Sequence, residues 1–239
     1  MKPSSPIYRL KQKARKISRS QAIPLRVALD HVAAEEGYKN WSLLAVKASA
    51  DGPARSVYAQ LTPGDLLLTG ARPGQGKTLF SLRLAAEAIK AGYSAHFFTL
   101  EYTRQQVADR LRAIGMGDQQ ALERFMFDGS DDISADYIVE KLRDAPAGTL
   151  AIIDYLQVLD QKRDKPQLAV QVGALKAFAK KKGVTLVFIA QIDRAYESVS
   201  KALPDFADVR LPNPLDLTVF DKAFFMNGGD MRLVQAPTA

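Results

Sequence analysis

A glycine-rich segment between an apolar strand and a helix constrains this chain most. Residues 65–69 form a short apolar run typical of a strand, and residues 77–91 carry apolar side chains at helical spacing. Between them, residues 70–78 read Gly-Ala-Arg-Pro-Gly-Gln-Gly-Lys-Thr. Small residues let several backbone N–H groups converge on phosphate oxygens, and the helix start adds a positive end. Strand, loop and helix in this order predict a phosphate-binding loop.

The side chains of this loop are those that a nucleotide and its cation require. We expect the Lys77 ammonium to contact the β- and γ-phosphates and the Thr78 hydroxyl to ligate Mg²⁺. The general form of such a loop has glycine where this chain has Ala71. The residues expected to bind the nucleotide are Ala71, Arg72, Pro73, Gly74, Gln75, Gly76, Lys77 and Thr78.

From residue 65 onward, short apolar runs alternate with helical patterns. This alternation predicts an α/β fold whose mostly parallel sheet is covered by helices on both faces. The expected strands lie near residues 96–98, 125–127, 150–154, 184–190, 219–225 and 231–234, and the expected helices near 77–91, 103–114, 134–142 and 168–182.

The region before the α/β domain differs in pattern and in charge. Residues 1–50 read as a small all-helical, basic segment, and residues 51–62, which hold prolines and glycines, read as a linker before a domain over 63–239. The chain carries a formal charge of +7, and residues 1–20 contain seven Lys and Arg and no Asp or Glu. The rest of the chain is therefore neutral. The basic arm predicts DNA, an anionic surface or an acidic partner protein as its binding partner.

Composition excludes several classes of protein. With no cysteine, the chain has no disulfides, no thiol nucleophile and no Cys-based zinc site. His31 and His96 lie far apart, which makes a His-built metal site improbable. The longest apolar runs, such as 184–190, are too short to span a bilayer, and the basic N-terminus lacks the apolar core of a secretion signal. We expect a cytoplasmic protein with no membrane partner.

Three polar residues stand where predicted strands end. Asp154 ends the apolar run 150–154, Glu101 follows the strand after the loop helix, and Gln191 follows the run 184–190. Ligands bind at the carboxyl ends of strands in such folds, where an acid can hold Mg²⁺ or activate water. The alternatives are a solvated acid at Asp154, an ordinary helix-start charge at Glu101 and a simple loop start at Gln191.

Four segments together resemble the ATPase domain of DnaB-type replicative helicases, within the RecA-like ATPases. They occur in the family's order, and Ala71, which departs from the general loop pattern, agrees with this family. The resemblance covers about residues 61–226 and implies a RecA-like P-loop ATPase fold for residues 63–239. The matching segments are Ala71-Arg72-Pro73 leading into Gly76-Lys77-Thr78, Leu100-Glu101, Ile153-Asp154-Tyr155-Leu156-Gln157, and Ala190-Gln191 with Arg194.

The resemblance assigns roles to the residues at these positions. It implies that ATP and Mg²⁺ are the cofactors, with Lys77 at the phosphates and both Thr78 and Asp154 at the metal. It makes Glu101 the base that activates water and Gln191 the sensor that joins nucleotide state to the DNA-contacting loops. It also implies action on single-stranded DNA and leaves open whether copies of the chain assemble into a ring. The expected DNA contacts are Lys162, Arg163, Arg194, Lys201 and Arg210.

Two departures from the family leave alternatives open. The family's N-terminal helical domain, which engages primase, is not seen, and residues 1–50 stand in its place. The family's arginine finger lies on a late strand, whereas residues 224–232 here read Phe-Phe-Met-Asn-Gly-Gly-Asp-Met-Arg, with Arg232 the nearest substitute. The leading hypothesis is a DnaB-like ATPase or helicase. The alternatives are a regulatory or DNA-binding adaptor that binds ATP without processive unwinding, and an antitoxin-like module fused to an ATPase.

Overall fold

The computed structural model describes residues 3–5, 7–44, 52–160, 166–198, 201–211 and 213–237. The chain divides into two compact units, residues 1–56 and residues 57–239, which are described separately. The short helix α4 (Pro53–Tyr58) crosses the boundary between them and lies in the segment expected to be a linker. No helix in the described ranges is long and apolar enough to cross a bilayer.

The first unit is a small helical body with its own apolar core. It contains α1 (Ile7–Ser20) and α2 (Leu25–Glu35), and a helical turn at 41–44 follows. The apolar stripe of α1 faces α2, because the sequence spaces those side chains one helical turn apart. The buried residues of this core are Leu10, Ala14, Ala28, Val32, Ala33 and Leu44.

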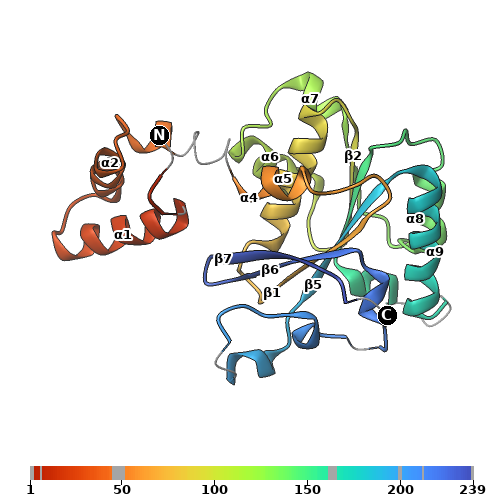
Figure 1. Ribbon diagram of the computed structural model, residues 1–239. Helices are drawn as coiled ribbons and strands as arrows, with labels where there is room; N and C mark the ends of the chain where they lie inside the picture. The colour runs from red at the N-terminus through yellow and green to blue at the C-terminus, as the bar shows by residue number, and fades with distance from the viewer. Residues whose placement is uncertain are drawn as a thin grey trace. The chain divides into compact units, whose positions relative to one another are not determined.

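The second unit is built on a seven-stranded sheet in the order β3-β2-β4-β5-β1-β6-β7 (Figure 1). All neighbouring strands are parallel except β7, which is antiparallel to β6. The strands are β1 (Leu66–Ala71), β2 (Ala95–Thr99), β3 (Phe125–Asp128), β4 (Leu150–Asp154), β5 (Thr185–Gln191), β6 (Lys222–Asn227) and β7 (Asp230–Gln235). The predicted fold class is confirmed.

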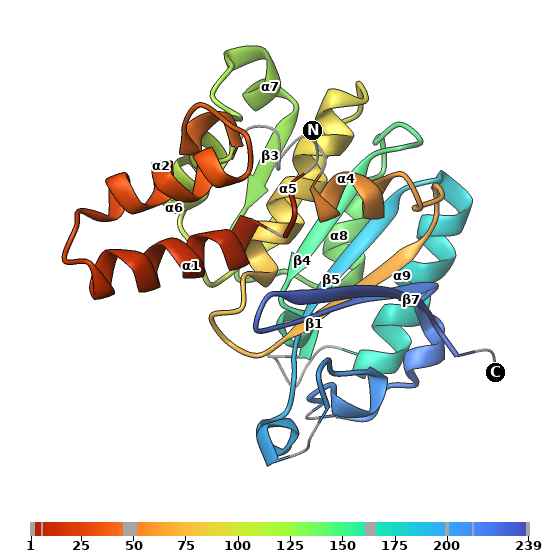
Figure 2. The same cartoon turned by 60° about the vertical axis from the view of Figure 1, so that its left-hand side comes forward.

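Helices cover both faces of the sheet, as Figures 1 and 2 show. On one face, α5 (Lys77–Lys90) contacts β1, β2, β4 and β5. On the other, α8 (Ala135–Lys141) and α9 (Leu168–Lys182) pack over alternate strand residues such as Leu66, Leu68 and Ile153. All residues of β1 and β4 are buried, as expected for strands covered on both sides. The remaining helices are α6 (Arg104–Ala113), α7 (Gln119–Glu123), η1 (Leu156–Asp160), η2 (Arg194–Ser198), η3 (Phe206–Asp208) and η4 (Leu217–Val219).

Besides α4, two segments differ from the sequence-based expectation. The strand expected at 219–225 begins only at Lys222, because residues 217–219 form η4, whose first N–H groups are capped by the Asp216 side chain. The short helix α7 is not predicted by the sequence, since its five residues are too few to show a helical period.

Strand register brings the functional side chains to one edge of the sheet. Ala71 at the end of β1 lies opposite Gln191 at the end of β5, and Thr99 at the end of β2 lies opposite Asp154 at the end of β4. Because these strands are parallel, their carboxyl ends meet at the same edge.

Candidate nucleotide site

The loop between β1 and α5 has the backbone of a phosphate cradle. Gly74 and Gly76 have φ of +77° and +91°, in the left-handed region that favours glycine. Nothing lies within 4 Å of where a Cβ would stand on either residue, so backbone conformation, and not crowding, demands glycine at both. Gly76 caps α5, which begins at Lys77 and points its free N–H groups toward the loop.

The Lys77 side chain is held across this loop. Its ammonium donates to the carbonyl oxygens of Ala71 at 2.9 Å and Arg72 at 3.2 Å. Burial lowers the pKa of Lys77, while the nearby charges of Asp154 and Glu101 oppose that change. The cation is therefore positioned over the loop, where the phosphates of a nucleotide would lie.

Asp154 and Thr78 form the centre of the site. The Thr78 hydroxyl donates to Asp154 Oδ2 at 3.2 Å, and the Asp154 side chain is buried. Burial and the charge of Glu101 raise the pKa of Asp154 to about 7, although Thr78, Lys77 and Arg110 act in the opposite direction. A buried carboxyl with so high a pKa has too little compensating positive charge around it.

These oxygens fit Mg²⁺. A hydroxyl and a carboxylate are the hard donors that this ion prefers, and a cation between them would supply the charge that Asp154 lacks. Among the described residues, no group of three or more His, Cys, Asp or Glu could hold a metal ion. Mg²⁺ would therefore complete its shell with phosphate oxygens and water, as it does in most nucleotide sites.

Glu101 lies at the same edge of the sheet. It follows the end of β2, its side chain is exposed, and its backbone N–H donates to Thr99 Oγ1 at 3.0 Å. Its charge raises the pKa of Asp154 and opposes the lowering of the pKa of Lys77. Thr103 then caps α6 through a reciprocal pair of hydrogen bonds with Gln106.

Gln191 lies beside the loop, as its strand register requires. It is half-buried at the end of β5, and its carbonyl accepts from the N–H of Arg210 at 2.8 Å. The next residue, Ile192, donates its N–H to the Ala71 carbonyl at 3.1 Å. The end of β5 is thus connected to the phosphate loop through the backbone.

Two side chains of the loop make contacts that the sequence does not predict. The Arg72 guanidinium pairs with Glu197 at 2.7 Å and donates to the Ile192 carbonyl at 2.9 Å. Gln75 Oε1 accepts from the N–H of Gly228 at 3.1 Å. The loop is therefore joined to the segment after β5 on one side and to the β6–β7 turn on the other.

Arg110 on α6 is a further residue that sequence reasoning missed. Its guanidinium lies 4.4 Å from the ring centroid of Tyr102 and donates to the Gln106 carbonyl at 3.1 Å. It is close enough to lower the pKa of Asp154. The signal in the sequence is its position on the helix that directly follows Glu101.

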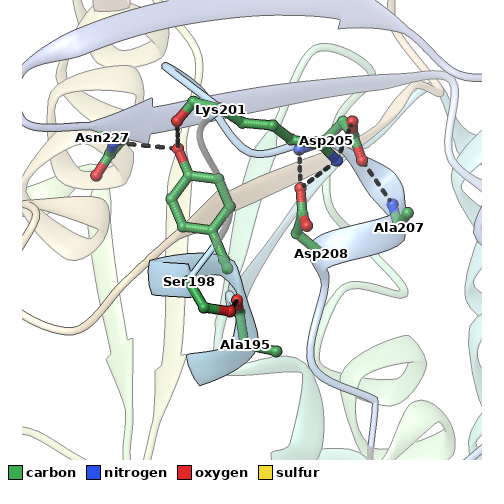
Figure 3. Close-up of polar contacts among 8 residues, drawn as sticks. Ala195, Ser198, Lys201, Asp205, Ala207, Asp208 and Asn227 are labelled. Atoms are coloured by element: carbon green, nitrogen blue, oxygen red, sulfur yellow. Dashed lines mark hydrogen bonds and ion pairs between the residues drawn. The ribbon is translucent and has the colours of Figure 1, made fainter.

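Figure 3 shows the segment after β5, in which Lys201 was expected to contact DNA. The Lys201 ammonium pairs with Asp205 at 2.9 Å and Asp208 at 3.2 Å. The buried Tyr196 donates its hydroxyl to the Lys201 carbonyl at 2.8 Å and accepts from Asn227 at 3.1 Å. Lys201 thus stabilises the fold of this segment.

The other expected DNA contacts have different surroundings. Arg194 and Arg210 are exposed and make no ion pair with any residue that the structure describes. Lys162 and Arg163 lie outside the described residues. Arg232, the nearest substitute for an arginine finger, lies exposed on β7 opposite Phe225.

The loop, its lysine and the buried Thr78–Asp154 pair define a P-loop nucleotide-binding site on a RecA-like sheet. A sequence profile of the family described as "ATPase: KaiC" matches residues 63–203. The chain belongs to this ATPase family, and its sequence is similar to those of DnaB-type replicative helicases.

Relatives and solved structures agree with this assignment. The replicative DNA helicase DnaB of Leifsonia xyli is 27% identical over 63% of this chain, and that of Geobacillus stearothermophilus is 25% identical over 61%. The chain spans only 40% and 39% of their lengths. Among solved structures, an isolated ATPase domain has a TM-score of 0.56 at 18% identity, and the match covers 77% of this chain and 80% of that domain. A DnaB-like replicative helicase has a TM-score of 0.59 at 20% identity, and the match covers 91% of this chain and 64% of that helicase.

Replacing Asp154 by Asn tests the burial of this carboxyl. Without Mg²⁺ and nucleotide, we expect Asp154→Asn to unfold at a higher temperature than the wild type, with a gain in stability of up to about 4 kcal/mol. The unfolded carboxyl ionises near pH 3.8 and the folded one near pH 7. The advantage of the variant therefore grows from about pH 4 to about pH 7 and then levels off.

Thermal melts across about pH 4 to 8 measure this effect, since that range covers the interval between the two ionisations. Asp118→Asn, at an exposed carboxyl, is the control. If the melting temperatures of Asp154→Asn and the wild type differed by the same amount across this range, the raised pKa of Asp154 would be contradicted.

Proposed function

We propose that this chain is the motor domain of a DnaB-like enzyme that couples hydrolysis of Mg²⁺-ATP to movement on single-stranded DNA. The observation that carries the proposal is the Thr78–Asp154 hydrogen bond beneath Lys77, at the sheet edge that also bears Glu101. The relatives named as replicative DNA helicases support the choice of DNA.

Each group of the site has a role in the proposed reaction. Backbone N–H groups of the loop and the Lys77 ammonium hold the β- and γ-phosphates. Thr78 and Asp154 would hold Mg²⁺, which would supply positive charge beside the phosphate oxygens. Glu101 accepts a proton from the attacking water, and its exposure leaves room for that water.

The contacts of the loop suggest how a change in the bound nucleotide could alter the residues that contact DNA. Arg72 contacts Glu197 and the Ile192 carbonyl, so a shift of the loop around a γ-phosphate would act directly on the segment after β5. That segment carries the exposed Arg194, whose cation is available to DNA phosphates. In this proposal Gln191 reports the γ-phosphate, and the Arg72–Glu197 pair transmits the change.

A second candidate function is supported by the β6–β7 turn. The turn reads Asn227-Gly228-Gly229-Asp230 and offers no cation to a neighbouring nucleotide. An arginine finger is worth about 10³–10⁵ in rate where it is used, so a chain without one would bind ATP and turn over slowly. Such a protein would act as an ATP-dependent DNA-binding adaptor.

Lys77→Ala tests the nucleotide site. We expect ATPase activity to fall by about 10²-fold or more, because the cation that holds the transferred phosphate is lost. ATP hydrolysis is measured with and without single-stranded DNA, and Lys181→Ala, an exposed lysine of α9, is the control. Equal activity of Lys77→Ala and the wild type would refute the site. Tight ATP binding by the wild type, with neither hydrolysis nor DNA stimulation, would favour the adaptor.

Glu101→Gln separates binding from chemistry. Loss of the proton acceptor should lower the rate of hydrolysis by about 10²–10⁴-fold. The affinity for ATP should change by less than about threefold, since Glu101 does not touch the phosphates in this proposal. Binding of a fluorescent ATP analogue and single-turnover hydrolysis give the two values. A loss of affinity that matches the loss of rate would remove Glu101 from the role of base.

Glu197→Gln tests the proposed transmission. Glu197 is 65% exposed, so its pair with Arg72 adds little stability, and basal ATPase activity should stay within about twofold. The increase of ATPase rate by single-stranded DNA should fall several-fold, because the loop no longer follows the segment after β5. The control is Glu123→Gln, an exposed residue of α7. Full DNA stimulation of Glu197→Gln would contradict the coupling.

A further inference from the structure

One surface of α1 carries four exposed cations that the ATPase site does not use. Lys11, Arg15 and Arg19 follow each other at intervals of four residues and so form one line along the helix, with Lys16 beside it. We call these four residues the basic stripe. Figure 2 shows α1 along its length.

The buried side of α1 shows which way the basic stripe faces. Leu10 and Ala14 are buried in the core of the first unit against α2. The basic stripe therefore faces away from that core. The same burial argues against a membrane surface, because the apolar side of α1 is not available for insertion between lipids.

The acids that the structure describes in this unit lie outside α1 and are already engaged. Glu35 pairs with Lys13 at 2.6 Å, Glu36 accepts from the N–H of Ser4 at 2.6 Å, and Asp30 accepts from the N–H of Trp41 at 2.9 Å. Residues 1–20 contain no Asp or Glu. Within the described ranges, the four cations of the basic stripe form no ion pair.

The dimensions and chemistry of the stripe fit a nucleic-acid backbone. From Lys11 to Arg19 a helix rises about 12 Å, a length along which duplex DNA carries about seven phosphate charges. Protein partners are held mainly by buried aromatic and apolar anchors, and the exposed large apolar residues recorded among the described side chains of this unit are Leu25, Val27 and Leu43, outside α1.

We propose that the basic stripe is a second nucleic-acid site, which binds the phosphate backbone of duplex DNA without sequence preference. It goes beyond the proposed function, because it lies in the helical unit and requires neither ATP nor the single-stranded DNA contacts of the ATPase domain. A duplex held there would keep the protein close to the strands on which the motor domain acts.

The test measures how duplex affinity depends on salt. The full chain and the triple variant Lys11→Gln, Arg15→Gln, Arg19→Gln are titrated against a labelled duplex of mixed sequence at several salt concentrations, without nucleotide. Each phosphate contact contributes about 0.9 to the slope of log affinity against log salt, so the triple variant should have a slope shallower by up to about 2.7. Its affinity should fall by at least tenfold at low salt.

Two controls are used, of which the first matches the change in charge and the second lies on the same helix. Lys180→Gln, Lys181→Gln, Lys182→Gln removes three cations from the last turn of α9, and Lys13→Gln removes an α1 cation that is paired with Glu35. Both should keep a slope close to that of the wild type. An unchanged slope in the stripe variant, or an equal loss in the α9 variant, would overturn the proposal.

Further measurements distinguish loss of this site from a folding defect, from loss of the ATPase site and from binding of a different partner. Thermal melts should show the stripe variant as stable as the wild type, because its substitutions leave Leu10 and Ala14 in place. Lys77→Ala should bind the duplex like the wild type, so failure of the ATPase proposal would leave this test intact. If the stripe variant lost binding to polyglutamate or to vesicles of anionic lipid but kept its duplex affinity, the stripe would serve a different partner and the proposal would be wrong.

Discussion

The site depends on a carboxyl group that the fold buries at the end of an apolar strand. Asp154 ends β4, all of whose residues are buried, and its pKa rises to about 7 because burial and Glu101 act together. Such a group destabilises the protein when it ionises, unless a cation enters. This destabilisation falls at the edge of the sheet that also carries Thr78 and Lys77, which we propose to bind Mg²⁺ and phosphate. Nucleotide binding and folding stability are therefore linked through one side chain.

The phosphate loop also connects parts of the chain that are far apart in sequence. Arg72 contacts Glu197, and Gln75 contacts Gly228, so the loop lies between the segment after β5 and the β6–β7 turn. Asn227 at the start of that turn holds the buried Tyr196. These contacts form a closed set around the loop, and a nucleotide that shifts the loop must act on both neighbouring segments.

The sequence predicts what depends on local pattern and misses what depends on tertiary contact. The loop, β4 and the order of strands and helices all follow from short-range periodicity and glycine placement. The late start of β6 does not follow from such patterns, because residues that read as its beginning belong to η4 instead. The Arg72–Glu197 pair joins positions 125 residues apart, and no local pattern reports such a pair. Lys201 pairs with carboxylates four and seven residues further along the chain, a local contact that its charge alone does not reveal.

A cation that pairs with a carboxylate of the protein holds local structure, whereas one without an ion pair is available to an external anion. The chain has seven more Lys and Arg than Asp and Glu, yet Lys201 and Lys13 pair with neighbouring carboxylates and hold local structure. Arg194, Arg210 and the basic stripe have no ion pair among the described residues. Excess charge therefore concentrates on α1, because residues 21–239 contain as many acids as Lys and Arg. In the proposals made above, the helical unit would hold duplex DNA through the basic stripe, while the ATPase domain would contact single-stranded DNA through exposed cations such as Arg194.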